Sequence, residues 1–249
     1  MFGSRTTTHS NFETITNKNF TWRSSDQAFV YYDKEAEERK PLPKGAKLIP
    51  LTTTNSVTGV RERDRGKATE RYNQIISNEF TDYKNEIVKV REIDRLDNTR
   101  NVLFEGVYSP TIKEAISGLQ FCKFTKNIYC LLDGEVVKLA LSGASLTAWI
   151  EFEDTLRKEH IRLVDGYYVT VGEPEHKKSG TVNYYAPTFS LGEISAEENA
   201  KANDVAVEVE DKIARNKLAS KTVEAVPTVP VQDAPIAPTE EISLDEVPF

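Results

Sequence analysis

Short runs of alternating apolar and polar residues, separated by turn-forming residues, dominate the first 190 positions of the chain. Residues 86–93 show the clearest alternation: odd-numbered residues from Ile87 to Arg91 fall on one face, and Val88, Val90 and Glu92 on the other. A period of two is typical of a strand with one buried face. Similar but less regular runs predict further strands at residues 29–32, 47–51, 56–60, 71–80, 101–108, 161–171 and 181–189.

A β-hairpin is predicted around Asp133-Gly134. The pair lies between two apolar runs, residues 124–132 and 135–141. Both residue types tolerate the positive φ angles that a two-residue hairpin turn requires. By contrast, residues 173–180 are polar and end in glycine, so we expect a turn there rather than a strand.

Three segments have helical features. Ser109 and Pro110 suit the cap and first turn of a short helix ending near Gly118. Apolar spacing predicts a second helix from Ser142 to about Arg157. The Ala- and Glu-rich residues 195–218 suit a third, although valines at every second position from Val205 to Val209 are less typical of a helix.

These patterns divide the chain into four parts. Residues 1–20 are polar and expected to be flexible, and residues 21–190 form a β-rich domain. Residues 191–222 are a helix or linker, and residues 223–249 are a Pro-rich acidic tail expected to be disordered. Many short strands with two helices favour an OB-like Greek-key barrel as the fold of the domain.

Charge is distributed unevenly along the chain. From Leu191 onward there are 5 Lys/Arg and 13 Asp/Glu, a net of −8, out of totals of 32 and 39. The remaining 27 and 26 give residues 1–190 a net of +1, so the overall charge of −7 describes the C-terminal part. An acidic average therefore does not exclude a basic binding surface on the domain.

Catalytic and metal-binding signatures are missing from the sequence. The three histidines are scattered, the two cysteines, Cys122 and Cys130, have no ligand-like companions, and no phosphate-binding glycine loop or GxSxG motif occurs. We expect no cofactor, no metal and no enzymatic activity. Reduced cysteines and the absence of a long apolar stretch or signal-like start predict a soluble cytoplasmic protein that does not enter membranes.

Tyrosines interleaved with basic residues are the remaining chemical signal. Aromatic rings stack on bases with little sequence preference, contributing about 1–3 kcal/mol per base, and Lys and Arg contact phosphates. Buried tyrosines and the acids within residues 61–67 weaken this signal. The candidate DNA-binding residues are Tyr31, Arg61, Arg63, Arg65, Lys67, Tyr72, Lys89, Arg91, Lys126, Tyr129, Tyr167, Lys177, Lys178 and Tyr184.

The chain ends in Asp245-Glu246-Val247-Pro248-Phe249. This ending resembles the acidic Pro-Phe tip of bacterial and phage single-stranded-DNA-binding proteins, in which a linker joins an OB fold to the tip. Residues 124–129, 141–152 and 177–187 are similar to a group of such phage proteins. The resemblance implies that Asp245, Glu246, Val247, Pro248 and Phe249 bind partner proteins.

The function expected from these features is coating and protection of single-stranded DNA in phage replication or recombination. Expected partners are single-stranded DNA, further copies of the chain on the DNA, and replication or recombination proteins recruited by the tip, in the host cytoplasm. One alternative is an adaptor β-barrel that binds only proteins through its tail. Another is a metal-dependent nuclease using a carboxylate pair such as Asp94 with Asp97, or the group Glu151, Glu153 and Asp154.

Overall fold

The computed structural model describes residues 13–62, 72–81, 86–94, 99–107 and 122–222 of the chain. These residues form strands and helices in the following order: β1 Asn19–Arg23, β2 Ala28–Asp33, β3 Glu38–Pro41, β4 Ile49–Glu62, β5 Tyr72–Ser77, β6 Ile87–Ile93, β7 Arg100–Val107, β8 Lys123–Leu132, β9 Glu135–Leu141, α2 Ala144–Lys158, β10 Tyr167–Val171, β11 Glu175–Ser179, β12 Val182–Ala186, β13 Phe189–Glu193 and α3 Ala196–Thr222.

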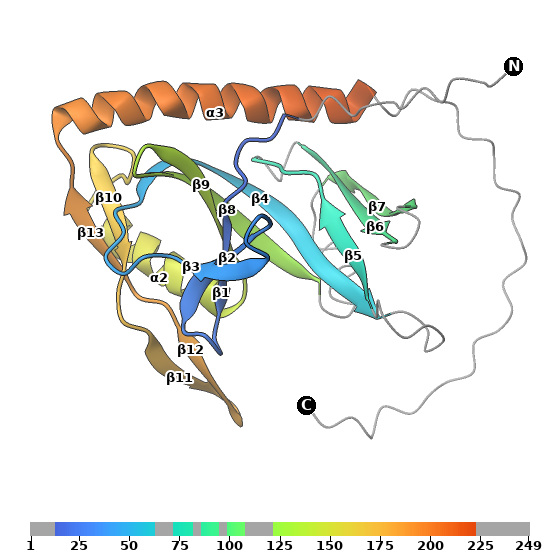
Figure 1. Cartoon of the computed structure of the whole chain (residues 1–249), viewed down its shortest axis with the longest axis horizontal. Helices are drawn as coiled ribbons and strands as arrows, with labels where there is room; N and C mark the ends of the chain where they lie inside the picture. Colours follow the sequence, from blue (N-terminus) through green and yellow to red (C-terminus); the bar gives the residue numbers. More distant parts are fainter. Residues whose placement is uncertain (1–12, 63–71, 82–85, 95–98, 108–121, 223–249) are drawn as a thin grey trace, which may run out of the picture.

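Nine of the strands form one mixed sheet in the order β3-β2-β1-β9-β8-β4-β5-β6-β7 (Figure 1). Strands β1 and β9 run parallel, and every other neighbouring pair is antiparallel. Within the described residues, β3 and β7 each pair on one side only, so the sheet is open. The closed OB-like barrel expected from the sequence is therefore not seen in this part of the chain, although the β-rich class is confirmed. Alternation reveals where strands lie but not whether the first and last strands meet.

Strand β8 lies at the centre of the sheet and is buried on both faces. Ile128 and Cys130 pack on one side with Trp149 of α2. Tyr129 and Leu131 pack on the other side with residues of α3. This burial on two faces explains why residues 128–132 form a continuous apolar run.

The hairpin between β8 and β9 has the predicted turn. Asp133 and Gly134 have φ angles of 50° and 83°, and Leu132 pairs with Glu135 across them. Positive φ at both positions is the geometry that an Asp-Gly pair favours. The prediction made from these two residues is confirmed.

Helix α2 covers one face of the sheet, as predicted for residues 142–157. Its N-terminus is fixed by Ser145, whose hydroxyl accepts from the Ser142 N–H at 3.1 Å and donates to the Ser142 carbonyl at 3.0 Å. Trp149 lies against Phe189 of β13 with the ring centroids 4.9 Å apart and the rings nearly perpendicular. This aromatic contact joins the helix to the β10–β13 pair.

The strands after α2 are shorter and more numerous than predicted. Only Tyr167–Val171 of the strand expected at 161–171 is extended, and the strand expected at 181–189 is divided between β12 and β13. Residues 173–180, expected to be a turn, include β11, which pairs with β12 through a Gly180 at φ 57°. A hairpin that is mostly exposed on both faces carries little of the apolar alternation on which the prediction relied.

Helix α3 crosses the opposite face of the sheet from α2 (Figure 1). The helix predicted at 195–218 is confirmed and extends to Thr222. It starts with reciprocal bonds: the Ser195 N–H donates to the Glu198 carboxylate at 2.9 Å, and the Glu198 N–H donates to the Ser195 hydroxyl at 3.2 Å. The bonds that the Glu198 carboxylate accepts from the Ser195 N–H and hydroxyl lower the pKa of Glu198. Ile213, buried with Leu51 and Leu131, makes α3 part of the core.

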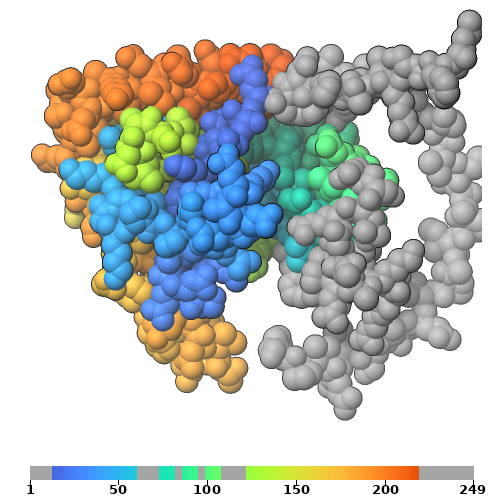
Figure 2. Space-filling view, in the orientation of Figure 1, coloured from blue at the N-terminus to red at the C-terminus, as the bar shows by residue number. Residues whose placement is uncertain are grey.

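The segment before β1 contacts the C-terminal part of α3. In Figure 2 the dark blue N-terminal residues reach the orange-red end of the helix. Glu13 forms a two-bonded ion pair with Arg215 at 2.8 and 2.9 Å, which lowers the pKa of Glu13. The Asn216 side chain accepts from the Glu13 N–H and donates to its carbonyl. These contacts join segments about two hundred residues apart in sequence.

Within the described residues, no helix combines the length and the apolar sequence needed to cross a bilayer.

Candidate nucleic-acid interface

The end of the sheet formed by β4–β7 has one packed face and one open face. The packed face contains Val57, Ile75, Phe80, Val88 and Val90, which are nearly inaccessible to solvent. Residues that face each other across an antiparallel pair lie on the same side of a sheet. The cross-strand row Thr58–Ile76–Arg91–Val102 therefore lies on the opposite, open side, as does the pair Lys89–Glu105.

The open face combines apolar and basic side chains. Ile87, Val102 and Val107 are about half exposed, although isoleucine and valine are among the residues most often buried. Lys89 and Arg91 alternate with buried residues along β6 and so lie on the same face as Ile87, as the sequence predicted. Lys89 Nζ lies 3.0 Å from the Glu105 carboxylate. We call this surface, formed by Ile76, Ile87, Lys89, Arg91, Val102, Glu105 and Val107, the open strand face.

An irregularity after β5 determines how the open strand face meets the rest of the sheet. Thr58 pairs with Ile76, and Asn55 bridges to Phe80, so three steps along β4 oppose four steps after β5. One extra residue is the mark of a β-bulge. The hydroxyl of Ser77 accepts from the Val57 N–H at 2.8 Å and so replaces a ladder bond.

Asn78 connects the bulge to β6. Its side-chain amide donates to the Ile87 carbonyl at 3.0 Å and accepts from the Lys89 N–H at 2.7 Å. The side chain thus substitutes for a backbone partner at the start of the strand. As a result, the position of Lys89 is coupled directly to the bulge.

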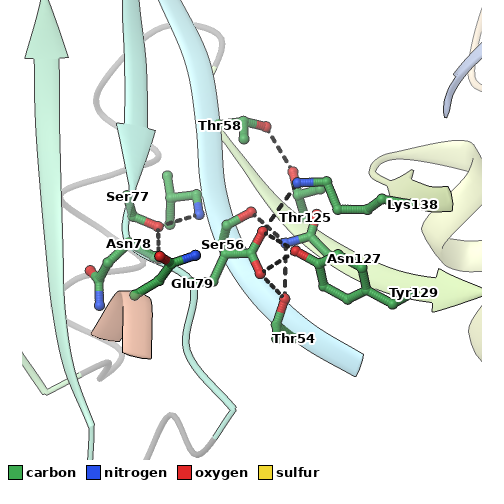
Figure 3. A network of polar contacts seen from close by, with 12 residues as sticks. Thr54, Ser56, Thr58, Ser77, Asn78, Glu79, Thr125, Asn127, Tyr129 and Lys138 are labelled. Carbon is green, nitrogen blue, oxygen red and sulfur yellow. Dashed lines mark hydrogen bonds and ion pairs between the residues drawn. The ribbon is translucent and has the colours of Figure 1, made fainter. Parts of the chain in front are cut away.

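The residue after Asn78, Glu79, is the centre of a polar network (Figure 3). Its carboxylate accepts from Tyr129 Oη at 2.9 Å, from Thr54 Oγ1 at 2.7 Å and from Lys138 Nζ at 3.1 Å. Burial, followed by the negative charge of Glu79 and its hydrogen bond, raises the pKa of Tyr129 far above its ordinary value. The Asn127 amide extends the network by donating to Thr54 Oγ1 at 3.3 Å.

A pocket of about 360 Å³ lies where the open strand face reaches the end of α3. Ile76 and Arg91 of the open strand face form part of its lining, together with Glu79, Tyr129 and Lys138 of the polar network. The other walls come from residues 13–16 and from α3.

The structure brings together only part of the predicted DNA-binding set. Lys89 and Arg91 lie on the open strand face, whereas Arg61 and Tyr72 belong to the paired ends of β4 and β5. The Arg61 and Tyr72 side chains lie outside the described part of the structure, as do residues Arg63, Arg65 and Lys67. The predicted protein-binding residues Asp245 to Phe249 also lie outside it.

A second group of predicted cations lies beside α2 on the other side of the sheet. Lys126 Nζ is 2.5 and 2.7 Å from the two carboxylate oxygens of Glu153. Lys177 Nζ is 3.0 Å from Glu151, and this bond raises the pKa of Lys177. Both lysines are therefore held by the carboxylates of one helix. Tyr184 lies opposite Lys177 in the β11–β12 hairpin, and Lys178 follows as an exposed residue.

The predicted tyrosines are less accessible than the sequence suggested. Tyr129 is 2% exposed, so its ring offers no face to a base. Tyr31 packs edge-to-face on Phe20 at 4.9 Å, and Tyr167 is half-buried. In the first tandem pair it is Tyr32 that is exposed, opposite Arg39 of β3. A pair of adjacent tyrosines shows that one ring faces outward, but only packing decides which one.

Sequence reasoning also missed the residues that shape the pocket. Asn78 and Glu79, which follow β5, and Asn216 of α3 are ordinary polar residues in two distant segments, and no local pattern connects the two segments. Their juxtaposition depends on the bulge after β5 and on the path of α3, which are both properties of the tertiary structure.

The carboxylate groups considered for a nuclease are placed differently from a metal site. Glu151 and Glu153 pair with lysines, and Asp97 lies outside the described residues. Within the residues that the structure describes, no three His, Cys, Asp or Glu side chains are grouped to hold a metal ion.

Comparison of the chain with protein-family models, with curated proteins and with solved structures gave no significant match. The assignment of a function therefore depends on the geometry described above and on the composition of the chain.

Proposed function

We propose that the chain is a non-catalytic single-stranded-DNA-binding protein whose DNA-binding surface is the open strand face. The observation that carries the proposal is the arrangement of Lys89 and Arg91 among half-exposed apolar side chains. The opposite side of the same strands is packed into a buried apolar cluster, so this side is the one available for binding. Apolar side chains can contact bases and sugars, while the cations contact phosphates.

The binding expected from such a surface is weakly sequence-specific. The two cations lie two residues apart on one strand, a spacing of about 7 Å that suits consecutive phosphates of an extended chain. The Lys89 side chain is only 15% exposed and contacts Glu105, so a phosphate must compete with a carboxylate for it. Each contact therefore contributes modestly, and coating a strand requires several copies of the protein.

The acidic C-terminal part completes the proposal. Residues 223–249 contain 6 Asp/Glu and no Lys/Arg, a net of −6 out of the overall −7, so an acidic arm follows the body that α3 completes. The resemblance of residues 245–249 to the tip of single-stranded-DNA-binding proteins supports a role in recruiting partner proteins. The protein would thus coat exposed strands during phage replication or recombination, in the host cytoplasm.

The test is a charge reversal on the open strand face with a matched reversal elsewhere. We expect Lys89→Glu to weaken binding of an oligo-dT and to make the dependence of log K on log salt less steep by about one phosphate contact. Lys158→Glu, at the exposed end of α2 on the other side of the sheet, should leave both quantities close to wild type. Fluorescence anisotropy at several salt concentrations measures them.

Two results would contradict the proposal. One is wild-type binding that does not change with salt, because phosphate contacts release counterions. The other is an equal loss of affinity in Lys89→Glu and Lys158→Glu, because then the open strand face would have no special role.

A protein-binding adaptor is the second candidate, and β7 is the feature that favours it. It is the last strand of the sheet among the described residues and exposes Val102 and Val107. An exposed edge with apolar side chains can accept a strand from another protein. An adaptor would leave the fluorescence anisotropy of labelled oligo-dT unchanged, whereas the first proposal predicts an increase on addition of the protein.

A further inference from the structure

The pocket next to α3 is continuous with the open strand face. Ile76 and Arg91 belong to both: they face each other across β5 and β6, and they also line the pocket. A strand of DNA lying along the row from Val102 to Arg91 therefore arrives directly at the pocket. Because of this position, one nucleotide of a bound DNA strand can enter the pocket without any change in the sheet.

The walls and size of the pocket suit a nucleobase. Ile15, Ile76 and Ile213 come from three different segments and provide apolar sides. Polar groups, including Glu79 and Lys138, lie in the same lining. A base has two apolar faces and a polar edge, so it requires both kinds of surface. The volume of about 360 Å³ is near the lower end of the range of about 300–1,000 Å³ for small-molecule pockets, which suits one nucleotide.

Two amide side chains in the lining are held in place before any ligand arrives. Asn78 is fixed by its bonds to Ile87 and Lys89, and Asn216 by its bonds to the N–H and carbonyl of Glu13. An amide has two donor hydrogens and two acceptor lone pairs, so each side chain retains one of each beyond these bonds. Groups already immobilised lose little conformational entropy on binding. They can therefore form hydrogen bonds with the edge of a base at low cost.

The charge of the lining suits a phosphodiester. Three cations, Arg91, Lys138 and Lys217, and two carboxylates, Glu13 and Glu79, line the pocket, a net of +1. One phosphodiester group carries a single negative charge. Arg91 is the cation shared with the open strand face, so a phosphate beside it can belong to the strand while the attached base enters the pocket.

We infer that this pocket binds one nucleotide of the bound single strand, with the base between the isoleucine side chains and its phosphate beside Arg91. The inference rests on the proposed DNA binding and assigns a defined subsite to it. It implies that one base in each protein-sized length of DNA is unstacked and held apart from its neighbours.

The test introduces one negative charge at the rim of the pocket. Thr14 is exposed and lines the pocket, so Thr14→Glu places a carboxylate where the nucleotide would lie. Thr147→Glu makes the same change at an exposed position of α2, on the opposite face of the sheet. The two readouts are the Kd for oligo-dT from anisotropy and the chemical-shift changes caused by thymidine monophosphate. Thermal unfolding verifies that both variants are folded.

We expect Thr14→Glu to weaken oligo-dT binding by roughly tenfold or more, because the added carboxylate occupies the space of the base and repels its phosphate. Its response to thymidine monophosphate should be lost. Thr147→Glu should behave as wild type in both measurements. An oligo-dT carrying 5-iodouracil should also crosslink on irradiation to the peptides that contain Ile76 or Asn216.

The outcomes separate this inference from the proposed function. If wild type binds oligo-dT and Thr14→Glu binds it as well as Thr147→Glu does, the pocket is not a nucleotide site and DNA binding stands. If wild type binds no oligo-dT, the proposed function fails. If it then still binds thymidine monophosphate in the pocket, the site serves free nucleotides, and the inference about a bound strand is overturned.

Discussion

Glu79 joins separate parts of the sheet through a single carboxylate. It follows the bulge after β5 and accepts hydrogen bonds from Thr54 of β4, Tyr129 of β8 and Lys138 of β9. The side chains of Glu79 and Lys138 are 25% and 20% exposed, so this ion pair is neither fully buried nor on the open surface. The contribution of this ion pair to stability therefore depends on the hydrogen bonds that accompany it, and above all on the bond from the buried Tyr129 hydroxyl.

Replacing Tyr129 by Phe tests this network through its pH dependence. At neutral pH we expect Tyr129→Phe to lower the free energy of unfolding by about 1–3 kcal/mol, because a hydrogen bond to a charged group is lost. Burial and Glu79 raise the pKa of Tyr129, so the native protein keeps this proton above pH 10 while the unfolded chain releases it. Stability conferred by the tyrosine is thus complete below about pH 10 and declines above it, by about 1.4 kcal/mol per pH unit.

Urea unfolding of wild type and variant between pH 7 and 11 measures this effect. The difference in free energy of unfolding between wild type and Tyr129→Phe should become smaller above pH 10. Wild type loses the stability that Tyr129 confers, whereas phenylalanine has no proton to lose. Tyr32→Phe is the matched control, because Tyr32 is 56% exposed and its replacement should not lower the free energy of unfolding at neutral pH. A constant difference between wild type and Tyr129→Phe across the whole range would show that the network does not perturb Tyr129.

At the scale of elements, α3 is the feature that most changes the view of the chain. The composition of this segment was compatible with either a helix or a linker. In the structure it is a helix that covers a face of the central sheet and forms a wall of the pocket. Its charges follow its axis: the acids lie up to Asp211, and cations predominate from Lys212 onward. This order suits the helix dipole at both ends.

The valines of α3 provide a paired test of its packing. Val209 is 2% exposed and contacts the core, whereas Val207 is 60% exposed. We expect Val209→Ala to lower the free energy of unfolding by about 2 kcal/mol through lost burial and a small cavity. Val207→Ala should change it by less than about 0.5 kcal/mol. Equal values from chemical denaturation would mean that α3 does not pack on the sheet in solution.

At the scale of the whole molecule, we propose that the open sheet binds DNA and that the acidic arm binds partner proteins. The body supplies a surface with two cations and a pocket, and residues 223–249 carry a net charge of −6 out of the overall −7. Binding of DNA and binding of a partner protein are then separable. Like charge also makes the arm unfavourable near a bound strand, an effect that salt screens.

Deleting Leu244–Phe249 tests this division. We expect affinity for oligo-dT to stay equal or increase at low salt, because the carboxylates of Asp245 and Glu246 no longer repel the phosphates. Retention of replication or recombination proteins from host extract should be lost. A full-length variant with Asp245→Asn and Glu246→Gln keeps the Pro-Phe ending but lacks the two acidic side chains. Comparing it with the truncated protein separates the effect of the charge from the effect of the Pro-Phe ending. Clearly weaker DNA binding by the truncated protein would place the tail inside the DNA-binding site.

Local signals in the sequence were sufficient for several elements. The Asp133-Gly134 turn, helix α2 and the two faces of β6 were all predicted from residues within a few positions of one another. Each depends on backbone preference or on side-chain alternation, which neighbouring residues determine. Lys89 and Arg91 belong to this class, since alternation alone placed them on one face.

Only the tertiary structure decided which surfaces those elements form. The parallel pairing of β1 with β9, the open ends of the sheet and the burial of Tyr129 depend on contacts between residues far apart in the chain. The same holds for Lys126 and Lys177, which α2 neutralises, and for the pocket that joins Ile76 to Asn216. Sequence therefore determined most of the strands, though not the exposed β3 and β11, together with the turn and the separation of charge. Long-range packing determined which side chains remain available for DNA, because burial and ion pairing depend on what each strand meets.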